Sequence, residues 1–112
     1  MLLIDGQWRA GKGADMHSEN PADGSRVWSG KAATADDVDA AFKAARAAFP
    51  AWGRSLYPER VAIVEAYQAY LEAHKDALAE LISRETGKPR WEGLAEAGAM
   101  IGKIAISKTA YA

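Results

Sequence analysis

The stretch "ISRETGKPRWEG", residues 82–93, joins two helical patterns and decides how the second half of the chain folds. Gly87 suits the left-handed conformation that ends many helices, and the fixed φ angle of Pro89 suits the first turn of a new one. A phosphate-binding loop would need a glycine five residues before the Gly-Lys pair and a Ser or Thr after it, where this chain has Ile82 and Pro89. Residues 87–89 are therefore predicted to form a plain turn between two helices.

Residues 34–112 show helical periodicity almost throughout. Thr34 and Asp37 have the spacing of a capping box, and the first helix, which ends at Gly53, has an apolar face made of Val38, Phe42, Ala45, Phe49 and Trp52. A second stripe starts at Ser55 or Pro58 and runs for roughly seven turns through Val61, Val64, Tyr67, Leu71, His74, Leu78 and Leu81. The third helix begins near Pro89 and carries Leu94, Met100, Ile101, Ile104 and Ala105. The pattern predicts three long helices.

Residues 1–33 have the pattern of short strands and turns. Asp5-Gly6 between apolar residues is a strong hairpin signal, and residues 11–13 and 20–25 are rich in turn formers. Strands are expected within "DMHSENP", residues 15–21, and within residues 26–33. Such a small antiparallel sheet is not stable alone. The predicted fold is therefore α+β, with a β segment over 1–33 and a helical segment over 34–112.

Composition limits the classes of function. The chain has 112 residues, 49% of them hydrophobic and 26% charged, and a net charge of −1, which gives no basic field for nucleic acid. It contains no cysteine, so it has no disulfide, zinc-thiolate site or thiol nucleophile of its own. No apolar run approaches the roughly 18 residues of a membrane span, and the N-terminus lacks the features of a signal peptide. These observations predict a cytoplasmic protein that binds neither nucleic acid nor membrane.

The titratable residues form no recognisable catalytic set. His17 lies in a predicted strand and His74 on a helix stripe, and no second histidine stands at metal-ligand spacing from either. Residues 11–13 lack the following helix of a dinucleotide site. Carboxylates on helices are most often solvated, which is the simplest interpretation of Glu92 and Glu96. Taken alone, the residues of this chain indicate no enzyme.

The apolar faces are too large for this chain to cover. Four tryptophans and four tyrosines are a heavy aromatic load for 112 residues, and the last helix runs to Ala112 without a C-terminal cap. We therefore expect a piece of a longer protein, prone to self-association through its exposed apolar surface.

Several short motifs occur in order along the chain, namely Asn20-Pro21 with Gly24, Asp37-Val38-Asp39, "AARAAF" at 44–49, Trp52, Arg60 and "ETGKP" at 85–89. In order and spacing they resemble the N-terminal part of the aldehyde dehydrogenase superfamily over nearly the whole chain. The segment "GKPRWEGLAEAGAMIGKIAISKTAY", residues 87–111, is similar more particularly to the N-succinylglutamate 5-semialdehyde dehydrogenases of bacterial arginine catabolism. Gly98 and Gly102 depart from the residues expected within that helix.

The resemblance implies a parent enzyme that oxidises an aldehyde to an acid with NAD, or with NADP, and this chain would be an incomplete part of its NAD-binding domain. In the family a Cys thiolate attacks the aldehyde, an oxyanion pocket stabilises the adduct, and a Glu activates water. All of these groups, the cofactor loop and the strands that build the homo-oligomer would lie beyond Ala112. No catalytic or cofactor-binding residue is therefore assigned to this chain, and no cofactor is expected to bind to it alone. The alternatives are another semialdehyde dehydrogenase of the superfamily and a non-enzymatic helical binding module.

The resemblance also implies two sites on this chain. Met100 and Glu96, one helical turn apart, would line the tunnel by which the aldehyde reaches the Cys, although Met100 could equally be a core residue. A monovalent cation would lie between the Glu85 carboxylate and the backbone carbonyls of Ser18 and Glu19. The simpler alternative for Glu85 is an ion pair with Arg84 or Lys88.

Overall fold

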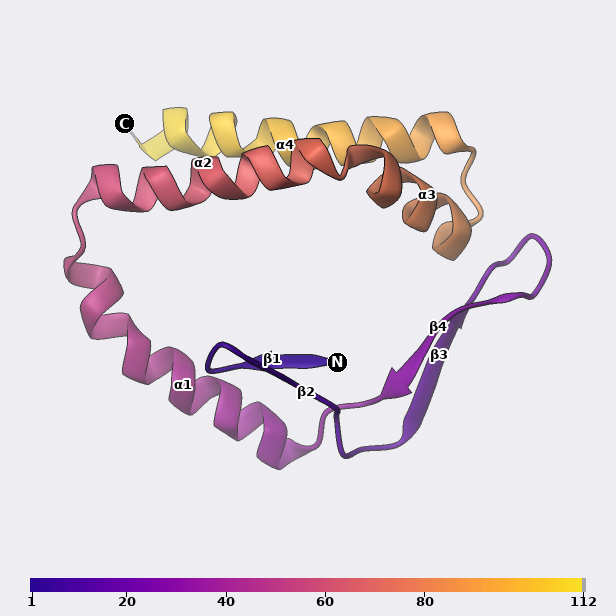
Figure 1. The fold of residues 1–112 in the computed structure, drawn as a ribbon, viewed down its shortest axis with the longest axis horizontal. Coiled ribbons are helices and arrows are strands. Elements are labelled where there is room, and N and C mark those ends of the chain that lie inside the picture. Colours follow the sequence, from indigo (N-terminus) through magenta and orange to yellow (C-terminus); the bar gives the residue numbers. More distant parts are fainter. Residues whose placement is uncertain (112) are drawn as a thin grey trace. The chain divides into compact units, whose positions relative to one another are not determined.

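The structure is a computed structural model that describes residues 1–111. The chain order of its elements is β1 (Leu2–Ile4), β2 (Gln7–Arg9), β3 (Asp15–Glu19), β4 (Arg26–Lys31), α1 (Ala35–Arg54), α2 (Tyr57–Ala73), α3 (Lys75–Thr86) and α4 (Arg90–Tyr111) (Figure 1). The predicted α+β class is confirmed: short antiparallel strands come first and long helices follow. The predicted end of the last helix at Ala112 lies outside the described residues.

The chain forms two compact units. Met1–Ser18 and Trp28–Ser55 make up the first, and Glu19–Val27 with the segment from Leu56 onward makes up the second. The strands pair as β1 with β2 and β3 with β4. None of the helices in residues 1–111 combines the length and the apolar character that a membrane crossing requires.

The first unit begins with the predicted hairpin. Asp5 and Gly6 both have positive φ angles, 54° and 71°, as the tightest two-residue hairpin turns require. The turn sets an antiparallel register in which Leu3 lies opposite Trp8. Ile4 is buried, and β1 lies against α1 beside Ala41, Ala44 and Ala48. The small alanine face of α1 is therefore the face that receives the hairpin.

A capping box fixes the start of α1, as predicted. The Thr34 hydroxyl accepts the Asp37 N–H at 3.3 Å, and Asp37 Oδ2 accepts the Thr34 N–H at 3.0 Å and the Thr34 hydroxyl at 2.9 Å. Hydrogen bonds from Thr34, with a smaller contribution from Lys12, lower the pKa of the Asp37 carboxyl. The helix ends at Arg54, one residue beyond the predicted Gly53. Its large apolar side chains remain exposed, including Phe42 and Phe49.

A close approach of backbones follows the hairpin. A Cβ on Gly11 would lie 2.3 Å from the carbonyl oxygen of Ala32, so only glycine fits there. This contact and the Gly13 N–H bond to the same carbonyl, at 2.9 Å, place the predicted turn at 11–13 beside the segment that leads into α1. The requirement for glycine is thus steric.

The prediction of one long second helix is wrong, and with it the number of three helices. The chain breaks at His74 into α2 and α3. The His74 N–H is shared between the carbonyls of Tyr70 and Leu71, each at 3.2 Å, and the His74 ring stacks on that of Tyr70 with centroids 4.0 Å apart. No Gly or Pro marks the break in the sequence. The change of direction lets α3 pack along α4, so tertiary packing overrides a continuous helical pattern.

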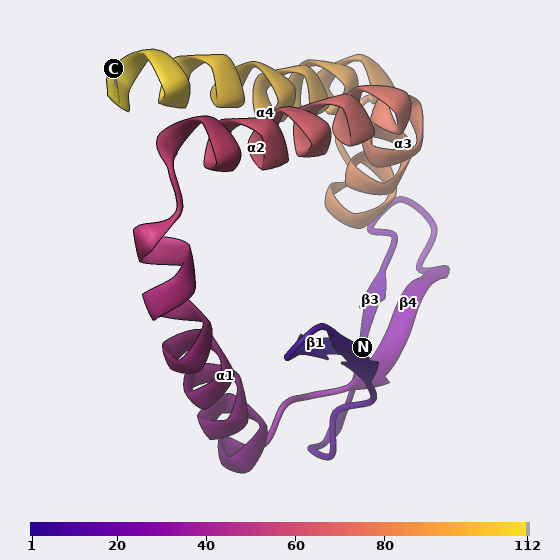
Figure 2. The same ribbon diagram turned by 60° about the vertical axis from the view of Figure 1, so that its left-hand side comes forward.

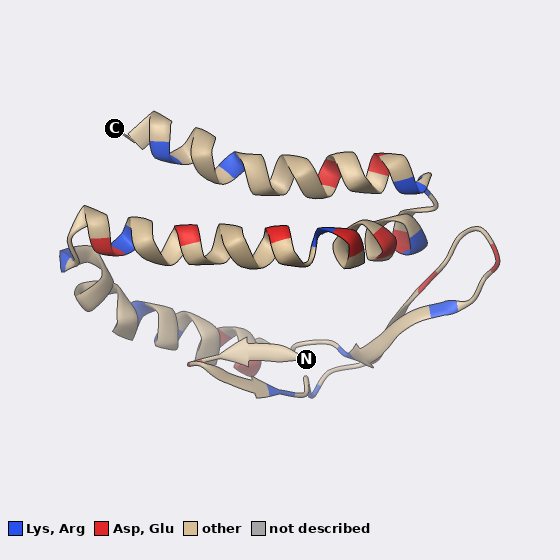
Figure 3. Ribbon diagram, turned by 45° about the horizontal axis from the view of Figure 1, so that its top comes forward, with Lys and Arg blue, Asp and Glu red and all other residues tan. Residues whose placement is uncertain are grey.

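The core of the second unit lies between α2 and α4. Leu71, Ile101 and Ile104 are buried, and Val64 and Leu78 pack against them. The two helices run side by side in both ribbon views (Figures 1 and 2). Their far ends are joined by stacked rings of Tyr57 and Tyr111, 4.7 Å apart, and by an ion pair between Lys108 and Glu65. Glu65 lies on α2 and Lys108 lies in the second half of α4, where the charged residues are basic (Figure 3).

The capping box predicts a pH dependence of α1. Because the pKa of Asp37 is lowered on folding, its carboxylate stabilises the helix above the usual carboxyl pKa, and this contribution is lost as the pH falls below about 4. Thermal unfolding followed by circular dichroism should show a midpoint that drops between pH 6 and pH 3. Asp37→Asn should lower the midpoint at pH 6 and flatten this dependence.

Asp36→Asn is the matched control, because Asp36 lies in the same first turn but outside the capping box. It should keep the full dependence on pH. An equal flattening by both variants would contradict the assignment to the capping box.

Candidate functional site

The turn between α3 and α4 is built as its sequence predicts. Gly87 has a φ of 76°, and its N–H donates to the carbonyl of Ser83 at 2.9 Å, which closes the end of α3. The Thr86 hydroxyl donates to the carbonyl of Ile82 at 2.7 Å and accepts the Lys88 N–H at 3.3 Å. The carbonyl of Pro89 then accepts the first N–H groups of α4, from Glu92 and Gly93. The turn therefore leaves α4 with a fixed starting direction.

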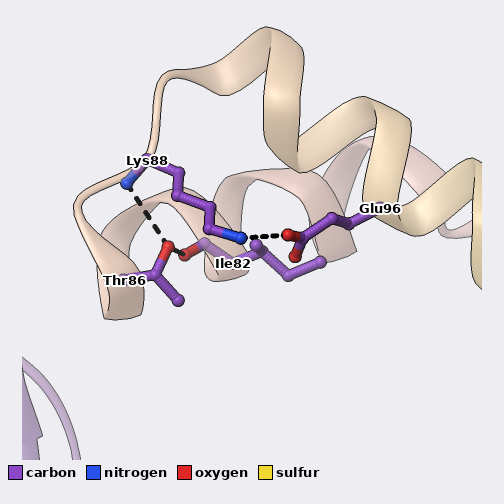
Figure 4. A network of polar contacts seen from close by, with 4 residues as sticks. All are labelled: Ile82, Thr86, Lys88 and Glu96. Carbon is purple, nitrogen blue, oxygen red and sulfur yellow. Dashed lines mark hydrogen bonds and ion pairs between the residues drawn. The ribbon is translucent and has the colours of Figure 1, made fainter.

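An ion pair crosses this turn. The Lys88 ammonium meets the Glu96 carboxylate, and Figure 4 shows the two side chains reaching toward each other above the end of α3. The hydrogen bond and charge of Glu96 raise the pKa of Lys88. Both side chains are close to half exposed, so the pair contributes little to stability. The pair also engages Lys88, the residue that would contact the phosphate if this turn were a phosphate-binding loop.

Helix α4, which follows the turn, packs closely against α3. A Cβ on Gly93 would lie 2.5 Å from the carbonyl oxygen of Ala79 and 2.8 Å from the hydroxyl of Ser83. Ala79 and Ala97 are fully buried. Small residues on both helices thus bring the two backbones together. A second ion pair, Arg90 to Asp76 at 3.0 Å, holds the first turn of α4 to the start of α3.

The loop over residues 20–25 lies at the end of α3, within the same unit. The Asn20 N–H donates to the carbonyl of Ser25 at 2.8 Å, which confirms the predicted turn. A Cβ on Gly87 would lie 2.8 Å from Cγ of Pro21, so the loop touches the helix cap. Hydrogen bonds from Ser25, and more weakly the charge of Arg84, lower the pKa of Asp23. The "NPADGS" and "ETGKP" motifs are therefore neighbours in space.

The two residues of the predicted tunnel lie as follows. Met100 is 42% exposed, and Glu96 is half-buried in its ion pair with Lys88. Neither belongs to the buried side of α4, which consists of Gly93, Ala97, Ile101 and Ile104. In the described residues, Met100 is thus not a core residue. Its place in a tunnel stays a prediction.

The predicted cation site is divided between the units. Glu85, which is exposed in the last turn of α3, belongs to the second unit together with Glu19, while Ser18 belongs to the first. Of the two alternative partners for Glu85, Lys88 pairs with Glu96. The cation stays a prediction, which metal analysis of the purified full-length enzyme would check.

Neither Gly-Lys turn in residues 1–111 has the strand-to-helix context of the Rossmann dinucleotide-binding loop. A dinucleotide site needs a glycine-rich turn from a strand into a helix, whereas residues 11–13 lie between β2 and β3 and Gly87 follows a helix. Among residues 1–111, no group of three or more His, Asp or Glu side chains is placed to hold a metal ion.

Comparison with known proteins decides the family. The family model described as "Aldehyde dehydrogenase family" matches residues 8–111. The chain belongs to the aldehyde dehydrogenase family. The sequence resemblance carried by the motifs at 20–25, 37–49 and 85–89 is thereby confirmed.

Individual aldehyde dehydrogenases agree with this assignment. The chain is 52% identical over 110 residues to an N-succinylglutamate 5-semialdehyde dehydrogenase from Serratia proteamaculans (strain 568), a match that covers 98% of this chain and 22% of that protein. It is 50% identical to the enzyme of the same name from Paraburkholderia xenovorans (strain LB400), of which it covers 23%. The crystal structure of a NAD-dependent benzaldehyde dehydrogenase from Corynebacterium glutamicum matches with a TM-score of 0.87 and 32% identity, over 91% of this chain and 22% of that one. The chain spans about a fifth of the length of these relatives.

Sequence reasoning missed two features of this site in the aldehyde dehydrogenase chain. The Lys88–Glu96 pair joins residues on opposite sides of a turn, and no helical spacing rule connects them. Gly93 carried a usable signal, because an isolated glycine inside a helical pattern often marks a close backbone approach. Gly98 and Gly102 carry the same signal, although the structure leaves room for a side chain at both.

The glycines of α4 give a prediction with internal controls. Alanine favours a helix over glycine by about 1 kcal/mol, so Gly102→Ala, in open space, and Gly98→Ala, in ordinary contact with Lys75, should raise the free energy of unfolding by up to that amount. Gly93→Ala should instead lower it by about 1–3 kcal/mol, because the new Cβ would overlap the backbone of Ala79. Urea unfolding of the three variants measures the difference.

Equal stabilisation by all three substitutions would show that α3 and α4 are not in close contact at Gly93. That result would also mean that the contact at Gly93 does not fix the direction of α4.

Proposed function

We propose that this chain is the N-terminal portion of an NAD(P)-dependent aldehyde dehydrogenase that oxidises N-succinylglutamate 5-semialdehyde to N-succinylglutamate in arginine catabolism, in the cytoplasm. The observation that carries the proposal is the identity of 50% or more, over 110 residues, with two enzymes of that name. The solved benzaldehyde dehydrogenase is much less similar in sequence, at 32%, although its fold matches well.

The local sequence supports this substrate over other aldehydes. The identity with the two N-succinylglutamate 5-semialdehyde dehydrogenases is measured over 110 residues and covers 98% of this chain, so the matched region includes the turn and α4. The runner-up is another semialdehyde dehydrogenase of the same family, which would share the motifs at 20–25 and 85–89.

We further propose that the chemical groups of the reaction come from a part of the polypeptide other than these 112 residues. The family's nucleophile is a Cys thiolate, and this chain contains no cysteine. Its proposed contribution is structural: the turn at 87–89 directs α4, and α4 presents Met100 and Glu96 to the path of the aldehyde.

The reaction is tested with two preparations. The enzyme of full family length that carries this segment should reduce NAD or NADP when given N-succinylglutamate 5-semialdehyde, with a kcat/KM at least ~10-fold above that for succinate semialdehyde. The 112-residue chain alone should give no reduction above blank. Following the reduced nicotinamide by absorbance measures both.

A preference of the full-length enzyme for another semialdehyde would contradict the proposed substrate and favour the runner-up. Reduction of cofactor by the 112-residue chain would contradict the proposal that its catalytic groups lie elsewhere.

The proposed tunnel predicts a size effect at Met100. Met100→Trp in the full-length enzyme should raise KM for N-succinylglutamate 5-semialdehyde more than for a short aldehyde such as propanal, because a larger side chain narrows the path of the larger substrate. Ile106→Trp is a control, since Ile106 is also exposed on α4 but lies on a different side of the helix.

Steady-state kinetics with both aldehydes measure the ratio. An equal rise in KM for the two substrates, or the same ratio for both variants, would indicate general destabilisation and remove Met100 from the tunnel.

A further inference from the structure

The first half of α4 carries acidic residues on the side that holds the proposed tunnel residues. Glu92 and Glu96 lie one helical turn apart, and Met100 follows after another turn, so the three residues share a side of the helix. The basic residues Lys103 and Lys108 lie in the second half of α4 (Figure 3). A substrate that carries carboxylates would therefore meet like charge along the first half of this helix.

The proposed substrate is itself an anion. N-Succinylglutamate 5-semialdehyde has two carboxylates besides its aldehyde, one on the succinyl arm and one on the α-carbon of the glutamate moiety. An unpaired Glu96 in the tunnel would repel both of them, and such repulsion is screened less in a narrow, partly dehydrated path than in bulk solvent. The acidic side of α4 therefore requires a compensating cation for this substrate to pass.

Lys88 supplies that cation from the turn. Its ammonium pairs with the carboxylate of Glu96, which lies eight positions further along the chain (Figure 4). The hydrogen bond and charge of Glu96, and more weakly the charge of Glu92, raise the pKa of Lys88. The Lys88 N–H donates to the Thr86 hydroxyl at 3.3 Å, so the turn fixes the base of the lysine side chain. Lys88 is thus held outside α4 and directed at its acidic side.

The basic residue at the start of α4 serves a different carboxylate. Arg90 pairs with Asp76 of α3 at 3.0 Å, and the side chain of Asp76 is 84% exposed. Removal of Arg90 would leave an unpaired carboxylate on α3, whereas removal of Lys88 would leave one on α4 beside Met100. The two cations, two residues apart, therefore offer a matched comparison.

We propose that Lys88 is a positioning residue that admits anionic aldehydes to the tunnel, because it holds and neutralises the carboxylate of Glu96. The inference rests on the proposed function, in which Glu96 and Met100 line the path of the aldehyde. It extends that function by assigning a role in specificity to a residue of the turn and by naming the property of the substrate that is selected, which is negative charge.

Steady-state kinetics of Lys88→Met in the full-length enzyme test the proposal with two aldehydes of equal carbon number. Succinate semialdehyde carries a carboxylate, and butanal does not. The variant should raise KM for succinate semialdehyde about 5-fold, the effect of one unit charge at roughly 8 Å under an intermediate dielectric constant, with little change for butanal. KM for N-succinylglutamate 5-semialdehyde should rise further, because it has two carboxylates. Lys88→Arg should keep the wild-type ratio of the two KM values.

The partner residue provides the second half of the test. Glu96→Gln alone should lower KM for succinate semialdehyde, because the charge of Lys88 is then unpaired and attracts the anion. The double variant Lys88→Met with Glu96→Gln should return the ratio of KM values close to that of the wild type. Arg90→Met is the matched control and should leave this ratio unchanged. Circular dichroism checks that each variant keeps its helices.

Three results would each overturn the proposal. One is an equal rise in KM for both aldehydes in Lys88→Met, which would indicate a structural role. The others are a double variant whose ratio stays at that of Lys88→Met, and a change of the ratio by Arg90→Met as large as that by Lys88→Met. A wild-type enzyme that prefers another semialdehyde would contradict only the proposed substrate, since succinate semialdehyde and butanal still measure the effect of charge.

Discussion

The contact that the second unit depends on is the approach of α3 to α4 at Gly93. No side chain separates the two backbones there, and the carbonyl of Ala79 and the hydroxyl of Ser83 fill the space that a Cβ would occupy. Close packing of this kind fixes the rotation of α4 about its own axis as well as its distance from α3. The contact at Gly93 therefore determines which residues of α4 face the rest of the unit and which face outward.

The orientation of α4 links packing to the proposed function. With Gly93, Ala97, Ile101 and Ile104 turned inward, Met100 lies at the edge of the buried side and Glu96 can reach Lys88 across the turn. The ion pair is weak because both side chains are close to half exposed, but it links the turn motif to the helix that follows. The proposed tunnel role of Met100 and Glu96 depends on this arrangement.

Local signals in the sequence predicted local structure well. The hairpin at Asp5-Gly6, the capping box at Thr34 and Asp37, and the left-handed Gly87 each depend on a few neighbouring residues with strong backbone preferences. The break at His74 could not be predicted in this way, because the apolar stripe continues across it through Leu71 and Leu78 while the cause lies in packing against α4. The candidate site at residues 87–96 shows the same contrast between local and tertiary signals. The turn was predictable, and the Lys88–Glu96 pair, which exists only once the chain has folded back, was not.

The break at His74 has an electrostatic consequence at a different helix. A single helix from Tyr57 to Thr86 would place Asp76 in its interior, but the break puts Asp76 in the first turn of α3, where the partial positive charge of a helix N-terminus favours a carboxylate. Arg90 occupies the equivalent first turn of α4, where the same partial charge disfavours a cation. Asp76 accepts a hydrogen bond from Arg90 at 3.0 Å, so the carboxylate held by one helix dipole compensates the cation opposed by the next. A bend in the chain at one helix thereby makes a basic residue tolerable at the start of another.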